Sequence, residues 1–93
     1  MTEKKITNEM IEELYSLIVS VDNVTDCRAL FDDLCTYNEI KQMAQRVKAA
    51  KLLLEGKTYS QVIEQTDISS ATLSRVSRCV QTGTGYSKLL NKC

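Results

Sequence analysis

The chain of 93 residues contains no proline, no histidine and no tryptophan, and it has only three glycines. Because proline and glycine are the residues that most often interrupt a helix, we expect helices along the whole chain. The lack of histidine removes the commonest general base, and no phosphate-cradling glycine loop or nucleophile elbow is present. These absences argue against an enzyme.

The four cysteines, Cys27, Cys35, Cys79 and Cys93, form no Cys-x-x-Cys pair. Without such a pair and without histidine the spacing of a zinc site is missing, so no metal or other cofactor is predicted. We expect reduced thiols, with Cys27 and Cys35 buried on one apolar helix face. No apolar run is long enough to span a bilayer and no signal-peptide pattern is present, so a cytoplasmic protein without membrane association is expected.

Charge is unevenly distributed along the chain, although its net value is zero. Residues 1–39 hold nine acidic and three basic side chains, a net charge of −6, and residues 40–93 hold nine basic and three acidic ones, a net charge of +6. A basic region attracts the phosphates of nucleic acid. The alternative is that both charged regions are simply solvated helix faces.

Apolar side chains recur at helical spacing in the first part of the chain. Thr25 is the expected cap of the second helix, and Thr36 with Glu39 forms a capping-box pattern that begins a third helix. We expect this third helix to be the longest and to end at Gly56. The repeated apolar positions are Met10, Leu14, Leu17, Ile18 and Val21, then Cys27, Leu30, Phe31, Leu34 and Cys35, then Ile40, Met43, Ala44, Val47, Ala50 and Leu54.

Residues 59–78, YSQVIEQTDISSATLSRVSR, have the pattern of two short helices joined by a tight turn. Thr58 with Gln61 predicts a capping box for the first helix, and Ser69 is a suitable N-cap for the second. Asp67 occupies the turn position where glycine is common, because aspartate adopts left-handed backbone at modest cost. The spacing predicts a helix-turn-helix, with a plain helical hairpin as the alternative. Its expected apolar anchors are Val62, Ile63, Ile68, Leu73 and Val76.

The second helix of this unit begins with small side chains and carries two arginines, which suits a helix that enters the major groove of double-stranded DNA. We expect Ser70, Ala71, Ser74 and Arg75 to face base edges while Ser69 caps the helix. Contacts to the DNA backbone are assigned to Ser60, Arg46, Lys48 and Arg78. The alternative from another class is a protein-interaction module, in which the acidic first helices or the surface of the helix-turn-helix dock on a protein partner.

We interpret residues 1–93 as one all-α domain with six helices. Residues 1–56 would form dimerisation helices, residues 58–80 the helix-turn-helix, and residues 85–93 a short C-terminal helix. The apolar faces exceed what so small a chain can cover, so a homodimer is expected. Two symmetric recognition helices would then read a palindromic site. A compact monomeric bundle is the alternative.

The segment from Thr36 to Cys79 resembles the Trp repressor family, and the whole chain is similar to its YerC/YecD branch. The resemblance implies an all-helical, intertwined homodimer from which each helix-turn-helix projects, and it implies a transcriptional repressor. It rests on Thr36-x-x-Glu39, Arg46-Val47, Leu53-Leu54-x-Gly56 and Ala71-Thr72-x-x-Arg75.

The same resemblance implies a corepressor pocket, and four residues match the family there: Arg46, Arg75, Thr36 and Thr72. Two further pocket positions depart from the family pattern, since Val76 replaces a glycine and Cys79 replaces a serine. The valine would occupy the space of a flat indole ring, and a thiol is a poorer hydrogen-bonding group than a hydroxyl. We therefore expect a regulator that does not respond to tryptophan. A different small anionic effector, held by the two arginines, is the alternative.

Overall fold

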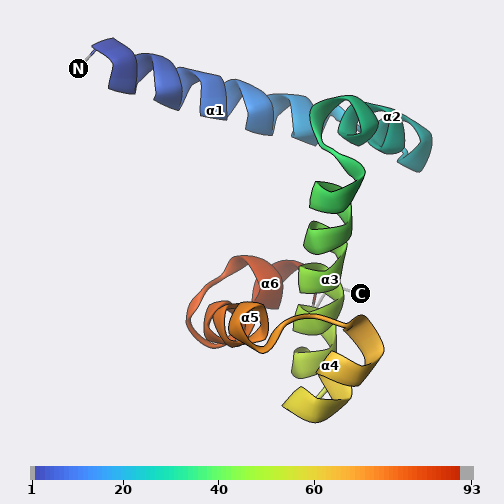
Figure 1. The fold of residues 1–93 in the computed structure, drawn as a ribbon. Helices are drawn as coiled ribbons and strands as arrows, with labels where there is room; N and C mark the ends of the chain where they lie inside the picture. The colour runs from blue at the N-terminus through green and yellow to red at the C-terminus, as the bar shows by residue number, and fades with distance from the viewer. Residues whose placement is uncertain (1, 91–93) are drawn as a thin grey trace. The chain divides into compact units, whose positions relative to one another are not determined.

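The computed structural model describes residues 2–90, with side chains from Ile6 onward. Over this part of the chain the backbone forms six helices and no strands, which confirms the all-α prediction (Figure 1). Residues 91–93, which complete the C-terminal segment expected to be helical, lie outside the described residues. No described helix is both long enough and apolar enough to cross a membrane. The helices are α1 (Thr2–Ser20), α2 (Val24–Leu34), α3 (Tyr37–Leu54), α4 (Tyr59–Thr66), α5 (Ser70–Thr82) and α6 (Gly85–Leu90).

The chain divides into two compact units, the first ending at Thr36 and the second beginning at Tyr37. The helix α3 therefore belongs to the same unit as α4 and α5, whereas the prediction from sequence grouped it with α1 and α2. A dimerisation role for residues 1–56 stays a prediction.

In the first unit, α2 is capped by Asn23 and not by Thr25 as predicted. The Asn23 side-chain carbonyl accepts a hydrogen bond from the backbone N–H of Asp26 at 2.8 Å. Asn23 has the extended backbone that an N-cap requires, with φ −149° and ψ 159°. Thr25 lies inside the first helical turn, so the prediction placed the cap two residues too late.

None of the side chains described in the first unit is buried. Val19 and Val24 are 82% and 70% exposed. The predicted burial of Cys27 is wrong because this unit has no buried core within one chain. Cys27 is exposed, and Cys35 is only partly buried. Each described cysteine is a free thiol. The apolar stripe of α1 and α2 therefore faces outward in the single chain.

The helix α3 begins at Tyr37, directly after Thr36, and ends just before Gly56, whose φ is +89°. It has 18 residues against 19 in α1, so it is not the longest helix as expected. Its predicted apolar face is only partly correct, since Ala50 is buried but Val47 is 47% exposed. Ala49 and Leu52, which the prediction did not include, are buried instead.

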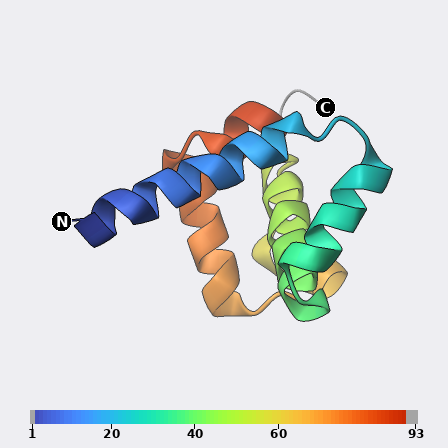
Figure 2. The same ribbon diagram turned by 90° about the horizontal axis from the view of Figure 1, so that it is seen from above.

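The core of the second unit lies where α3 packs against α4, α5 and α6. In Figures 1 and 2, α3 lies alongside α5 and α6. The small side chains of Ala49 and Ala50 let the neighbouring helices approach α3 closely. Each fully buried aliphatic side chain stabilises such a core by about 1.5 to 3 kcal/mol. The buried core residues are Ala49, Ala50, Leu52, Val62, Ile68, Leu73 and Val76.

Candidate nucleic-acid interface

The helix α4 begins with the capping box that the sequence predicted. Thr58 Oγ1 accepts from the Gln61 backbone N–H at 3.2 Å, and Gln61 Oε1 accepts from the Thr58 backbone N–H at 2.9 Å. Two N–H groups that have no partner within the helix are thereby satisfied. The start of α4 is therefore fixed by local chemistry.

The turn after α4 passes through Asp67, which has φ 62° and ψ 20°. Its backbone N–H donates to the carbonyl of Ile63 at 2.8 Å, closing the end of the helix. This left-handed conformation is the one that the sequence predicted for Asp67, and aspartate tolerates it better than most residues that carry a side chain. The turn ends α4 and leads into α5 within three residues, which is the spacing of a helix-turn-helix.

The helix α5 is capped at both ends. Ser69 Oγ accepts from the Thr72 backbone N–H at 3.2 Å and donates to Thr72 Oγ1 at 2.9 Å. At the other end the Gly83 N–H donates to the Cys79 carbonyl at 2.8 Å. A Cβ at residue 83 would stand 2.7 Å from that carbonyl oxygen, so glycine is the residue that fits there. These caps fix the length of the candidate recognition helix.

The two faces of α5 differ sharply. Leu73, Val76 and Ser77 are buried against the rest of the unit. The side chains predicted to face base edges are all exposed: Ser70, Ala71, Ser74 and Arg75. Arg78 is also exposed, and so are Ser69 at the cap and Ser60 near the start of α4. This face offers small polar groups and two cations to a ligand as large as a DNA groove.

The predicted backbone-contact residues of α3 lie in the same unit as α5. Lys48 is exposed and Arg46 is partly buried. Among the described residues, no ion pair neutralises Arg46, Lys48, Arg75 or Arg78. These cations are therefore available to phosphate without first breaking a bond inside the protein.

A hollow of about 330 Å³ lies between α3 and the turn, next to Arg46 and Thr72. Two of the residues implied for a corepressor pocket therefore come together there. Arg75 does not line this hollow. Val76 is 1% exposed and belongs to the core. The full lining is Gln42, Gln45, Arg46, Asp67, Ile68, Ser69 and Thr72.

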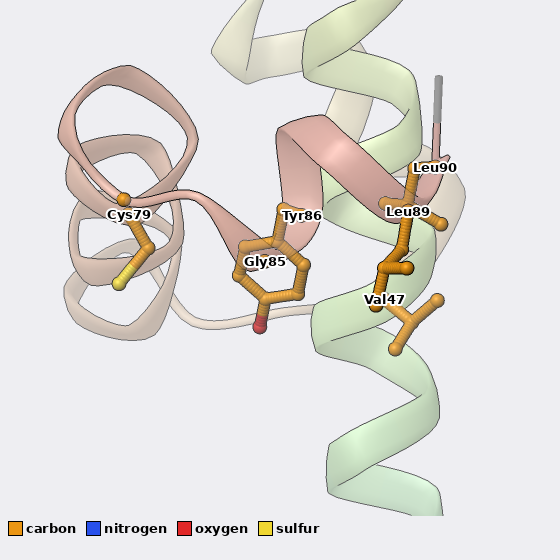
Figure 3. A pocket seen from close by; sticks show the side chains of 7 residues that line it. Val47, Cys79, Gly85, Tyr86, Leu89 and Leu90 are labelled. Carbon is orange, nitrogen blue, oxygen red and sulfur yellow. The ribbon is translucent and has the colours of Figure 1, made fainter. Parts of the chain in front are cut away.

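A larger hollow of about 510 Å³ lies between α3, the end of α5 and α6, and the sequence reasoning missed it. Figure 3 shows the Tyr86 ring between Cys79 on one side and Val47 on the other. The helix α6 is tied to α5 by Ser87 Oγ, which donates to the Val80 carbonyl at 2.9 Å. Three apolar residues that follow the glycines, Tyr86, Leu89 and Leu90, are the feature of the sequence from which this hollow could have been predicted. The lining residues are Val47, Cys79, Gly83, Gly85, Tyr86, Leu89 and Leu90.

Comparison with known proteins gives a consistent result. The profile of the family described as Trp repressor protein matches residues 9–93. The uncharacterized protein YerC of Bacillus subtilis is 42% identical over 79 residues, which cover 85% of this chain and 76% of YerC.

Two solved structures have the same fold as this chain, and each is 36% identical to it in sequence. A crystal structure from Staphylococcus aureus, described as that of a candidate Trp repressor, has a TM-score of 0.88 at 36% identity, covering 99% of this chain and 93% of that one. A TrpR-like protein from Eubacterium eligens has the same TM-score and identity, covering 96% of this chain and 93% of its own.

Proposed function

We propose, from the premise that this chain belongs to the Trp repressor protein family, that it is a sequence-specific DNA-binding transcriptional regulator. The observation that carries the proposal is the division of α5 into a buried apolar face and an exposed face with Ser70, Ala71, Ser74 and Arg75. Small residues let the helix approach base edges, and arginine pairs with guanine in the major groove. Such a regulator would act in the cytoplasm, where bacterial DNA lies.

Binding of tryptophan is not part of this proposal. Val76 is buried in the core, and it stands where the family resemblance implies a glycine, just as Cys79 stands where it implies a serine. The space for a flat ring against α5 is therefore occupied by a side chain that also holds the helix in place. We expect the DNA affinity to be independent of tryptophan.

A selection from random-sequence DNA with the purified protein, run with and without tryptophan, tests the function. The expected result is one enriched motif that is the same in both arms. Enrichment of no motif would favour the protein-interaction alternative, in which the same exposed face docks on another protein. A motif that is enriched only in the presence of tryptophan would contradict the expectation that DNA binding is independent of tryptophan.

Gating by a different small anion is a second candidate, favoured by the hollow beside Arg46 and Thr72. Arginine binds carboxylate and phosphate well. A ligand that binds the folded protein raises its melting temperature, so a thermal-shift panel of amino acids and anionic metabolites is informative. If millimolar concentrations of every compound leave the melting temperature unchanged, this candidate is dropped.

We also propose that the working form is a homodimer. Support comes from the first unit, where no described side chain is buried and apolar residues face outward. An apolar stripe of this kind marks an interaction surface. The first unit is acidic and the second is basic, so the units of two copies attract each other. The outward apolar residues are Ile6, Met10, Ile11, Tyr15, Leu17, Ile18, Val19, Val24 and Leu34.

Sedimentation velocity at micromolar concentration is expected to give one species with twice the mass of the 10.5 kDa chain. The physical reason is that the apolar stripe of α1 and α2 has no cover within one chain. A species of 10.5 kDa that persists over the concentrations at which DNA binds would contradict the dimer.

Replacing Lys48 by alanine is expected to weaken binding to selected and random DNA by the same factor. A lysine that touches only phosphate carries no sequence information, and its loss should reduce the salt slope by about 1. The measurement is the dissociation constant for both DNAs at several salt concentrations. The matched control is Lys88→Ala on α6, which removes an exposed lysine that we do not assign to the interface. Equal salt slopes for Lys48→Ala and the parent would remove Lys48 from the contacts.

A further inference from the structure

A hydrogen bond joins α3 to the turn between α4 and α5. Gln45 Nε2 on α3 donates to the backbone carbonyl of Thr66 at 3.1 Å, across 21 positions in the sequence. Thr66 is the last residue of α4, so its carbonyl lacks a partner within the helix. Gln45 satisfies this carbonyl from a partly buried position.

The side chain of Thr66 forms hydrogen bonds to residues on both sides of the turn. Its Oγ1 donates to the Val62 carbonyl at 2.7 Å and accepts from the Ile68 backbone N–H at 3.3 Å. Ile68 is buried, and the next residue, Ser69, is the cap of α5. A movement of Thr66 relative to α3 would therefore be passed through two residues to the start of the recognition helix.

Gln45 also shares a hollow with each of two α3 cations that we assign to phosphate, Arg46 and Lys48. It lines the hollow that contains Arg46, and it lines a second hollow of about 310 Å³ that contains Lys48 and Asp67. Both cations are on α3, whereas the base-reading residues are on α5. The distance between these two sets of residues depends on how the turn is held on α3. DNA presents phosphates and base edges at fixed separations, so this distance decides whether both sets can make contact at the same time.

We propose that Gln45 is a positioning residue, which sets the pose of α5 relative to the phosphate-binding cations of α3 through its hydrogen bond to Thr66. The inference rests on the proposed DNA-binding function and adds a determinant of specificity that contacts no DNA. Gln45 does not act by charge, since its amide is neutral. It acts by keeping α5 in the pose that binds DNA. Loss of the hydrogen bond to Thr66 therefore lowers the fraction of protein molecules in the DNA-binding conformation.

The test is Gln45→Met, which keeps the length and the helix propensity of the side chain but removes the donor. Affinity for the selected site is expected to fall about fivefold, as the loss of one neutral hydrogen bond implies. Affinity for random DNA is expected to stay the same, because phosphate attraction does not need one fixed pose. A purely structural defect would lower the folded fraction and weaken both DNAs equally.

The matched control is Gln81→Met, the same change at an exposed glutamine near the end of α5, which lines none of the hollows described above and is not assigned to DNA. It should leave the ratio of selected to random affinity at the parent value. Gln45→Ala is the second variant if Gln45→Met does not fold, since alanine is the strongest helix former. An unchanged ratio in a folded Gln45 variant would overturn the positioning role. A parent protein without any selected site would instead overturn the proposed function itself.

Discussion

Replacing Leu73 by alanine is expected to lower the free energy of unfolding by about 2 to 5 kcal/mol, which is a large part of the stability of a small domain. Leu73 is on the buried face of α5, is 0% exposed, and is one of the largest fully buried side chains. Its loss removes apolar contacts and leaves a cavity that the surrounding helices fill only in part. The helix α5 would then be held to the rest of the second unit by fewer contacts.

Urea denaturation followed by circular dichroism measures this loss, and all variants must be compared at one protein concentration because a dimer gains stability with concentration. The control is Leu89→Ala, the same change at a leucine of the second unit that is 61% exposed and lies outside the proposed dimer surface. We expect a much smaller loss of stability from this control than from Leu73→Ala, because far less apolar surface is lost from the core. A Leu73→Ala protein as stable as the parent would mean that α5 is not packed as described.

Replacing Arg75 by alanine is expected to cost about 1 to 3 kcal/mol of binding free energy at the best DNA site and to relax the base preference there. The guanidinium is exposed on the outer face of α5 and forms no ion pair among the described residues. An arginine that donates two hydrogen bonds to guanine loses both on truncation, and no neighbouring side chain replaces them.

Arg78→Ala is the matched comparison, because Arg78 is an exposed arginine on the same helix. We assign it to phosphate, so its loss should weaken selected and scrambled sites alike. Competition binding with a panel of single-base variants of the selected site separates the two effects. If Arg75→Ala binds matched and scrambled DNA with parental affinities, Arg75 does not read a base.

The parts of the fold that depend on local chemistry were predictable from the sequence. The capping box of Thr58, the cap at Ser69 and the left-handed Asp67 follow from side chains that bond to the backbone within a few residues. Helical spacing also identified the buried anchors Val62, Leu73 and Val76, whereas the predicted anchor Ile63 is only partly buried. The cap of α2 was missed only because Asn23 is an even better cap than Thr25 and lies earlier.

The packing face of α3 was less predictable, because it is set by residues distant in sequence. Ala49 carries little apolar surface, yet it is buried where neighbouring helices approach α3. Val47 is more apolar and is 47% exposed. Likewise, nothing near Gln45 in the sequence indicates a partner 21 residues away. Pattern reasoning identifies which residues are apolar, but not which neighbour covers them.

The candidate interface was predictable as a surface but not as a pocket. Ser70, Ala71, Ser74 and Arg75 lie exposed on one helix because helical geometry alone places them together. The pocket residues implied by family resemblance come from separate elements, and only Arg46 and Thr72 share a hollow. Which of these pocket residues lie together depends on how the helices pack, and the spacing of residues along the sequence does not reveal this.

The burial of Val76 has an evolutionary consequence. A glycine at this position would reopen space beside α5, but it would also remove a core side chain and weaken the helix that carries the reading face. A descendant could therefore not acquire a flat aromatic effector by a single mutation without losing stability at the same step. A stabilising change elsewhere would have to arise first. The order in which mutations accumulate would therefore limit which effectors the proposed regulator could come to bind.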